Sequence, residues 1–257
     1  MAEKVKAQAV VISMEQLAGD IYSLWIKEQT IANQAKAGQF ISFFSKDGSK
    51  LLPRPISICE IDKANGALRV VFRVVGFGTK EFSQLKEGET VDVMGPLGNG
   101  YTFEGKKALL IGGGIGIPPM LELAKSLSIE KSIVLGYRTN DLFLKNDFET
   151  YGDVYVSTED GTAGTKGNVI DAIKEHNIDA DIIFACGPTP MLKGVKAYAA
   201  EHGIKAQLSL EEKMACGIGA CLACVCKSKE KDHHSNVNNK RVCKDGPVFY
   251  ADEIDEF

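Results

Sequence analysis

The cysteines near the end of the chain have the spacing best suited to chemistry. Four of the seven cysteines fall within thirteen residues, in the segment MACGIGACLACVC at 214–226, and a fifth follows a polar insertion. Cys216, Cys221, Cys224 and Cys243 form a C-x4-C-x2-C pattern with a distant fourth cysteine, the spacing of plant-type 2Fe–2S ligands. The small residues between them let the main chain approach a flat inorganic core and direct backbone N–H groups at its sulfurs. The pattern therefore predicts a 2Fe–2S cluster.

Two other interpretations of these cysteines compete with the cluster. A structural zinc site usually uses two C-x2-C pairs, whereas this segment contains one, so zinc is less favoured. A reactive thiol pair is the other alternative. Cys226 is surplus to the four-ligand pattern and receives no ligand role, and His233 and His234 lie in a polar insertion where we expect them to be solvated.

Glycines that follow apolar segments predict nucleotide-binding turns. In LLIGGGIGIPPM they would lie between a strand and a helix, where backbone N–H groups can meet a pyrophosphate. The run departs from the Rossmann fingerprint, because Ile117 occupies the third required glycine position. A later strand end, in FACGPTPML, strengthens the prediction, although a free cysteine such as Cys186 is more often a buried core residue. The candidate nucleotide-binding residues are Gly112, Gly113, Gly114, Gly116, Cys186, Gly187 and Pro188.

Two segments in the first hundred residues have phosphate-binding character. In RPIS, near the end of a predicted strand, Arg54 can bind a phosphate, Pro55 stiffens the backbone, and the Ser57 hydroxyl could reach the edge of a flavin ring. In VFRVVGFGTKEF a short helix would open at Thr79, so that the N–H groups of Gly78 and Thr79 face a second phosphate. Taken alone, Thr79 is as readily a helix N-cap and Arg54 a surface charge. The order of all these motifs along the chain favours the functional interpretation.

The elements that must position these residues follow from the hydrophobic pattern. Short alternating segments separated by turn residues predict a small antiparallel barrel in the first hundred residues. Its predicted strands are 5–13, 21–27, 39–44, 67–75 and 90–94. From residue 107 to residue 210 apolar strands alternate with helical stretches, which predicts a parallel sheet with right-handed crossover helices. The cysteine region is too short for a hydrophobic core of its own, and a bound metal centre would stabilise it.

The predicted fold class is therefore multidomain, α/β plus β. We expect an N-terminal antiparallel β-barrel at 1–102, a central parallel-sheet nucleotide-binding domain at 103–210 and a C-terminal 2Fe–2S module at 211–257. The net charge of −4 provides no basic surface for nucleic acid. The N-terminus does not resemble a secretory signal, and no apolar run approaches the about 18 residues of a membrane span. We expect a cytoplasmic address with no membrane partner, where clustered cysteines bind metal rather than form disulfides.

The motifs RPIS, GPLG, GGGIGIPP, CGPTPML and MACGIGACLACVC…RVCKDGPVF together resemble the ferredoxin reductase superfamily. More narrowly, the whole chain is similar to the iron–sulfur electron-transfer subunits of NAD-dependent, class 1B dihydroorotate dehydrogenase. The block EEKMACGIGACLACVCK is the most specific part of this similarity. The resemblance implies an oxidoreductase with FAD on the barrel, NAD on the sheet and a 2Fe–2S cluster at the C-terminus.

The resemblance also implies roles for individual residues. The cluster ligands would be the four cysteines named above, and NAD would bind at the glycine turns and at Cys186. Ile56 stands where many flavin reductases carry an aromatic residue. The residues implied to bind FAD are Arg54, Pro55, Ile56, Ser57, Val71, Phe72, Arg73, Gly78 and Thr79.

A separate catalytic subunit containing FMN is the partner that the resemblance implies, in a heterotetramer with two copies of each chain. Electrons from dihydroorotate would pass through FMN, the cluster and FAD to NAD+ during UMP synthesis. The same machinery attached to a hydrogenase or a transhydrogenase is the closest alternative. A non-catalytic, zinc-stabilised nucleotide-binding module is an alternative of another class. No general base or nucleophile is predicted, because the chain would supply distance and potential rather than acid–base chemistry.

Overall fold

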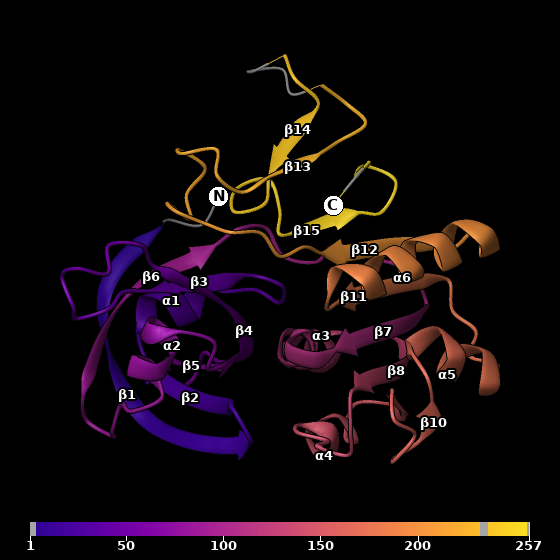
Figure 1. Cartoon of the computed structure of the whole chain (residues 1–257), viewed down its shortest axis with the longest axis horizontal. Helices are drawn as coiled ribbons and strands as arrows, with labels where there is room; N and C mark the ends of the chain where they lie inside the picture. The colour runs from indigo at the N-terminus through magenta and orange to yellow at the C-terminus, as the bar shows by residue number, and fades with distance from the viewer. Residues whose placement is uncertain (1–3, 232–235, 256) are drawn as a thin grey trace.

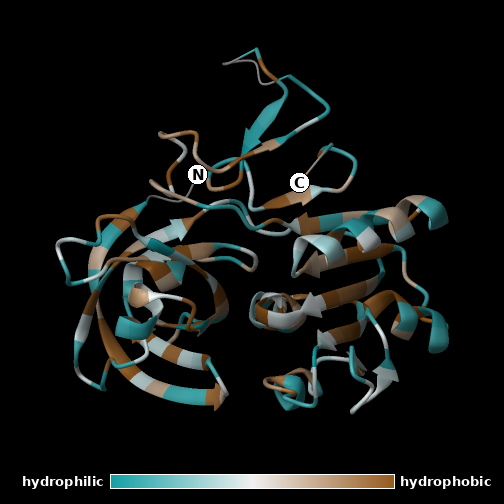
Figure 2. Ribbon diagram, in the orientation of Figure 1, coloured by the Kyte–Doolittle hydropathy of each residue, from teal (hydrophilic) through white to brown (hydrophobic). Residues whose placement is uncertain are grey.

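The computed structural model describes residues 4–231, 236–255 and 257. A barrel and a sheet lie side by side, and the cysteine-containing segment crosses above both of them (Figure 1). Hydrophobic residues concentrate on the strands of both bodies (Figure 2). No helix within the described residues combines the length and the apolar character that crossing a bilayer requires.

The first body is a closed antiparallel barrel with the strand order β1-β2-β5-β4-β3-β6. Alternation along each strand sends one set of side chains inward, so that Ile41 and Phe43 of β3 join the barrel core while Phe40 joins a different core outside it. Its strands are β1 (Val5–Ala18), β2 (Ile21–Lys27), β3 (Phe40–Phe43), β4 (Arg54–Asp62), β5 (Ala67–Arg73) and β6 (Thr90–Leu97). Its helices are α1 (Gln29–Gln34) and α2 (Phe77–Phe82).

The barrel confirms the predicted architecture but differs from it in detail. Residues 54–57 begin β4 instead of ending a strand, so RPIS starts the strand that lies between β5 and β3 in the barrel. Helix α1 was not expected, because six residues are too few to show a helical period. Its start is fixed by Glu28, whose carboxylate accepts the N–H of Ile31 at 2.5 Å.

The second body is a seven-stranded sheet with the order β10-β9-β8-β7-β11-β12-β15. All neighbouring strands are parallel except β15, which pairs antiparallel with β12. The strands are β7 (Lys107–Gly113), β8 (Glu130–Tyr137), β9 (Asp153–Thr158), β10 (Thr165–Lys166), β11 (Ile182–Cys186), β12 (Lys205–Ser209) and β15 (Val248–Tyr250). The helices are η1 (Gly114–Gly116), α3 (Pro118–Ser126), α4 (Lys145–Phe148), α5 (Val169–Glu175) and α6 (Thr189–His202).

The two faces of the sheet bury different side chains. Leu110 and Phe184 pack with α3 and α4 on the face toward the barrel, whereas Leu109 and Ile183 pack with α5 and α6 on the other face. The parallel-sheet prediction is confirmed. It did not include β15, the last strand, which comes from the cysteine region.

The C-terminal segment contains a small hairpin and then returns to the sheet. The hairpin strands are β13 (Val225–Lys227) and β14 (Asn239–Arg241). Several of its residues, among them Cys224, Cys243 and Phe249, share one hydrophobic core with Phe40 and Leu97 of the barrel and with helices α5 and α6. This shared core fixes the cysteine region against both bodies.

Candidate metal centre and nucleotide sites

The four predicted ligand cysteines come together in two pairs. The thiol of Cys216 lies next to that of Cys221, and the thiol of Cys243 lies next to that of Cys224. The N–H of Cys243 also donates to Cys224 Sγ at 3.4 Å. Cys224 and Cys243 are buried, whereas Cys216 is half-buried and Cys221 is exposed. One pair therefore lies in the core and the other at the surface.

Backbone N–H groups of the loop point at the thiols. Cys216 Sγ accepts from Ile218 at 3.4 Å and from Ala220 at 3.3 Å, and Cys243 Sγ accepts from Gly219 at 3.1 Å. Burial alone would raise the pKa of the Cys216 thiol, but N–H donors, first that of Ile218, outweigh burial and lower that pKa to about 6. These donors thus stabilise negative charge on the Cys216 sulfur, whereas burial raises the pKa of the Cys243 thiol to about 12.

The paired arrangement suits a two-iron cluster better than a single ion. Each iron of a 2Fe–2S core takes two cysteine ligands, whereas structural zinc takes four protein ligands on one ion. The residues present therefore fit the 2Fe–2S cluster, with one pair of thiols for each iron.

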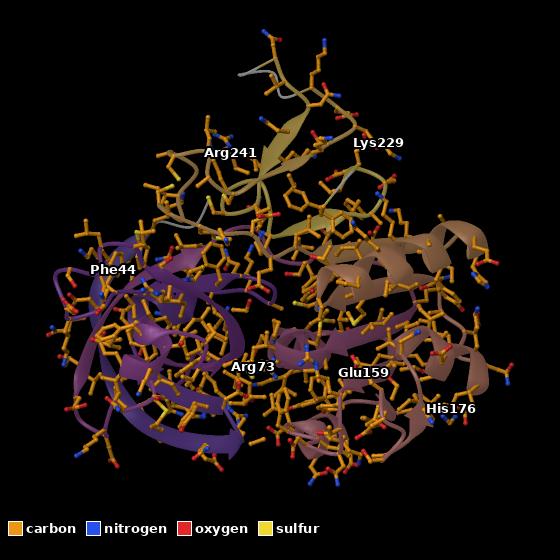
Figure 3. The ribbon with its side chains drawn as sticks, in the orientation of Figure 1. Phe44, Arg73, Glu159, His176, Lys229 and Arg241 are labelled. Carbon is orange, nitrogen blue, oxygen red and sulfur yellow. The ribbon has the colours of Figure 1, made fainter. Side chains whose placement is uncertain are left out.

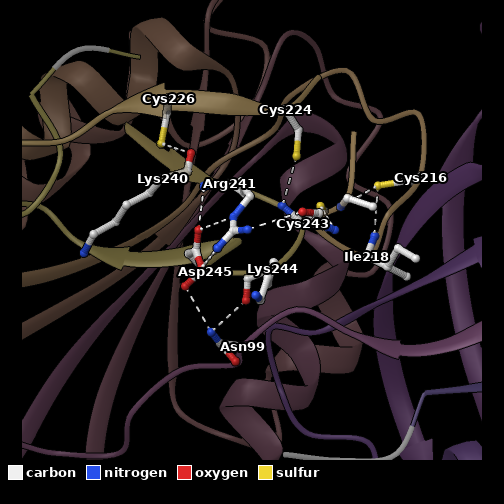
Figure 4. A network of polar contacts seen from close by, with 12 residues as sticks. Asn99, Cys216, Ile218, Cys224, Cys226, Lys240, Arg241, Cys243, Lys244 and Asp245 are labelled. Atoms are coloured by element: carbon white, nitrogen blue, oxygen red, sulfur yellow. Dashed lines mark hydrogen bonds and ion pairs between the residues drawn. The ribbon is translucent and has the colours of Figure 1, made fainter. Parts of the chain in front are cut away.

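A polar network behind the cysteines holds the loop in shape (Figure 4). Arg241 forms an ion pair with Asp245 at 3.0 Å and donates to the carbonyl of Gly219 at 3.3 Å. The Asn99 side chain, just after β6, donates to the carbonyls of Lys244 at 3.1 Å and Asp245 at 3.0 Å. Sequence reasoning missed these residues. One indication of their role was present in the sequence: Arg241 and Asp245 each lie two residues from Cys243, a predicted cluster ligand.

Cys226 is buried and its thiol donates to the carbonyl of Lys240 at 3.6 Å, directed away from the four paired cysteines (Figure 4). Burial raises its pKa to about 11. Both features suit the role of a small core residue. His233 and His234 lie outside the described residues.

The two predicted phosphate-binding segments of the barrel are neighbours in space. A Cβ atom on Gly78 would lie 2.7 Å from Nε of Arg54, so the guanidinium lies directly against the start of α2. Thr79 is not the N-cap of α2, because the helix begins earlier, with Gly76 as the cap residue. Instead, Thr79 Oγ1 accepts the N–H groups of Val75 at 3.0 Å and Gly76 at 3.2 Å.

Other predicted flavin residues divide between the two faces of the barrel wall. Ile56 is buried in the barrel core, so alternation places Pro55 and Ser57 on the outer face. Phe72 also points inward and stacks on Tyr22, with ring centroids 6.2 Å apart. Because its side chain faces the core, only the backbone of Phe72 could contact a cofactor. On β5, Val71 packs outward against the core shared with the sheet.

A cavity of about 710 Å³ lies between the barrel and the carboxyl ends of the parallel strands. Of the predicted residues, Arg73, Gly113, Gly114 and Pro188 line it. Arg73 forms an ion pair with Asp20 at 3.3 Å on the barrel side. Figure 3 shows Arg73 on the barrel and Glu159 across from it on the sheet. The position agrees with the rule that open parallel sheets bind ligands beyond their strand ends.

The remaining predicted nucleotide residues form the wall behind this cavity. Gly112 is in register with Cys186 on the neighbouring strand, and a Cβ atom on Gly116 would lie 2.4 Å from the Cys186 carbonyl oxygen. A Cβ atom on Gly187 would lie 2.4 Å from Cε of Met191. The Gly116 contact is with backbone, so glycine is needed there for the turn after β7 to approach the end of β11. The lining also includes residues that the sequence analysis did not select. Tyr137 and Ser157 lie at the ends of β8 and β9, and Glu159 directly follows β9; the others include Phe143, Asn168 and Met191.

Comparison with known proteins agrees with this geometry. The family model "Iron-sulfur cluster binding domain of dihydroorotate dehydrogenase B" matches residues 211–255, and the model "Oxidoreductase NAD-binding domain" matches residues 110–197. A solved NADH-dependent reduced ferredoxin–NADP oxidoreductase superposes with a TM-score of 0.86 at 34% identity, covering 97% of this chain and 90% of that one. A flavohemoglobin from Malassezia yamatoensis shares the fold, with a TM-score of 0.66 at 21% identity over 78% of this chain and 57% of that one. The fold and the cysteine site thus define an iron–sulfur reductase of the ferredoxin reductase type.

Full-length relatives narrow the class to one family. The "Dihydroorotate dehydrogenase B (NAD(+)), electron transfer subunit" of Fusobacterium nucleatum is 44% identical over 253 residues, which is 93% of this chain and 95% of the relative. The protein of the same name from Bacillus cereus is 42% identical over 259 residues, covering 97% and 98%. The chain belongs to the family of dihydroorotate dehydrogenase B electron transfer subunits. The sequence-based resemblance, the fold class and the expected iron–sulfur, flavin and nicotinamide cofactors are confirmed.

Proposed function

We propose that this chain is the electron-transfer subunit of a dihydroorotate dehydrogenase and connects an FMN-containing catalytic subunit to NAD+ in pyrimidine synthesis. One observation carries the proposal: the cysteine loop packs directly on the barrel wall beside the predicted flavin strand. A Cβ atom on Gly217 would lie 3.0 Å from Ser42 Oγ on β3, and Ser42 is paired with Pro55 on β4. The proposed metal and flavin sites would thus be one strand apart.

The chain's own residues would bind and orient the cofactors. Cys216, Cys221, Cys224 and Cys243 would hold the 2Fe–2S cluster. When bound, the cluster transfers single electrons, and the flavin exchanges single electrons for the hydride that NAD accepts. Residues 1–102 would bind FAD, residues 103–210 would bind NAD, and residues 211–257 would bind the cluster.

For the flavin, Arg54 and the N–H groups of Gly78 and Thr79 would bind the pyrophosphate, because they already lie together at the start of α2. Ser57, on the outer face of β4, would face the ring edge, with the backbone of 71–73 along the next strand. For NAD, the turns at 112–116 and 186–188 would receive the nucleotide in the cavity between barrel and sheet.

The catalytic subunit would dock over the exposed cysteine loop. Ile218, Leu222 and Val225 surround the ligand cysteines and remain exposed, Leu222 by 56%. Apolar side chains at this exposure are costly on a free surface and are typical of interface cores. An interface there would place the cluster between the two flavins, in a complex with two copies of each subunit.

The proposal is tested by purifying the chain with and without a coexpressed FMN-containing partner. We expect iron and inorganic sulfide in equal amounts, FAD, and oxidation of dihydroorotate by NAD+ only when both chains are present. Cys216→Ser should lose at least half of the iron and the EPR signal of the reduced cluster, whereas the matched variant Cys226→Ser should keep both. Equal iron loss in the two variants would contradict the ligand assignment. Copurification with a hydrogenase or a ferredoxin-oxidising partner would contradict the dihydroorotate assignment.

A further inference from the structure

Ser42 carries a buried hydroxyl that the protein itself does not satisfy. Its residue is only 1% exposed, and its Oγ has no hydrogen-bond partner among the residues that the structure describes. A buried hydroxyl without a partner is destabilising, because no hydrogen bond compensates for its lost hydration. Within the same residues one other side-chain atom shares this state, Ser157 Oγ, which belongs to a residue lining the nucleotide cavity. Both hydroxyls therefore lie at sites where a ligand is expected.

The surroundings of Ser42 direct its hydroxyl to the cysteine loop. Alternation along β3 places Ser42 on the outer face with Phe40, and a Cβ atom on Gly217, the residue after the proposed ligand Cys216, would lie 3.0 Å from its Oγ. Leu97 and Met94 approach the same point, at 3.4 and 3.9 Å from a Cβ atom on Gly217. These two neighbours are apolar and offer the Ser42 hydroxyl no acceptor.

We propose that the Ser42 hydroxyl donates a hydrogen bond to a sulfur of the 2Fe–2S cluster and thereby raises the reduction potential of the cluster. This inference rests on the proposed ligand set. Reduction adds one negative charge to the cluster, and a donor in a low-dielectric contact stabilises the reduced form more than the oxidised form. Ser42 is a positioning and tuning residue, contributed by the barrel to a cluster that the C-terminal segment binds.

The test is an EPR-monitored redox titration of the complete complex. Ser42→Ala should shift the midpoint potential of the cluster to more negative values and leave its iron content unchanged. Ser157→Ala is the matched control, because it removes an equally buried hydroxyl from the nucleotide cavity, and it should leave the potential of the cluster in place. If Ser42→Ala loosens the loop, Ser42→Thr and Ser42→Val form an isosteric pair, of which only Ser42→Thr should keep the wild-type potential.

The outcomes separate this inference from the proposed function. Wild-type protein without inorganic sulfide would overturn the proposed function itself. A full cluster whose potential is the same in wild type, Ser42→Ala and Ser42→Val would overturn the inference alone. A shift confined to the flavin potential would assign the hydroxyl to the flavin and would equally overturn it. A negative shift of the cluster in Ser42→Ala and Ser42→Val, with Ser42→Thr unmoved, would support it.

Discussion

Gly217 and Gly219 decide how closely the main chain approaches the ligand cysteines. Their φ angles are +70° and +85°, in the left-handed region that glycine enters without steric cost. A Cβ atom on Gly219 would also lie 2.5 Å from Cδ of Lys244, the residue after the fourth ligand. The loop therefore needs glycine for two reasons, its backbone conformation and its contact with the neighbouring segment.

Gly219→Ala should weaken the cluster. The substitution costs about 1–2 kcal/mol of backbone strain and displaces the N–H that donates to Cys243 Sγ at 3.1 Å. We expect faster loss of iron to a chelator, followed by the bleaching of the visible spectrum. Gly194→Ala in helix α6 is the matched control, because its Cβ atom would meet only ordinary contact at 3.9 Å. A chelation rate in Gly219→Ala equal to that of the control would show that the N–H does not protect the cluster.

Among the elements, helix α3 and strand β4 form the main contact between sheet and barrel. Glu122 of α3 is buried, and its carboxylate accepts the N–H of Ile61 at 2.7 Å and the hydroxyl of Ser126 at 3.0 Å. Burial raises the pKa of this carboxyl, partly offset by these hydrogen bonds and by Lys125. The folded state therefore holds the proton more tightly than the unfolded state. Stability is lost as the pH rises from the unfolded value near 4.5 through the raised folded value.

Glu122→Gln should remove this loss of stability at higher pH, while its side-chain carbonyl still accepts the N–H of Ile61. We expect the variant to have the higher free energy of unfolding at neutral pH, and the difference to shrink below pH 4.5, where the wild-type carboxyl is protonated in both states. Urea titrations across this pH range measure it. Glu175→Gln, at an exposed position of α5, is the control and should not change the slope. A Glu122→Gln variant whose stability follows the wild-type pH profile would contradict the assignment.

Sequence patterns within short segments predicted the features whose signal lies within one such segment. Strand β2 matches the predicted 21–27, and the four proposed ligand cysteines, which were selected from spacing alone, lie close together, because periodicity and ligand spacing are properties of short segments. Strand β15 was missed, since three residues show no period and its partner β12 is distant in sequence. Ser42 was also missed, because the burial of a hydroxyl depends on contacts between distant segments. Only the folded structure shows, among the residues it describes, that this hydroxyl is buried without a hydrogen-bond partner.

At the scale of the whole molecule, the relay depends on two contacts that the barrel makes. The cysteine loop rests on β3 and β6. This contact would set the separation of the proposed cluster and flavin sites. The sheet rests on β4 and β5, which sets the width of the nucleotide cavity. Arg69 of β5 is central to the second contact. Its guanidinium pairs with Glu60 of β4 at 2.8 Å and with Asp147 of α4 at 3.0 Å, and it donates to Ser23 at 2.8 Å.

Arg69→Met should destabilise the chain and loosen the nucleotide cavity. Arg69 is buried, and its removal leaves the partly buried Glu60 with only a long contact to Lys125 at 3.9 Å, so we expect a loss of about 3–5 kcal/mol. Asp147 is 41% exposed, and Asp147→Asn should cost about 1 kcal/mol or less. Denaturation of the flavin-loaded chain measures both.

The Arg69→Met variant also tests whether this contact affects the reaction with NADH. With the barrel less firmly attached to α4, Arg69→Met should raise the KM for NADH more than it lowers the rate of flavin reduction at saturation. The EPR signal of the cluster should stay unchanged, because Arg69 lies on the opposite contact of the barrel from the cysteine loop. If Arg69→Met altered the cluster signal and left the KM unchanged, the two contacts would not act independently, and the division of the relay between them would be wrong.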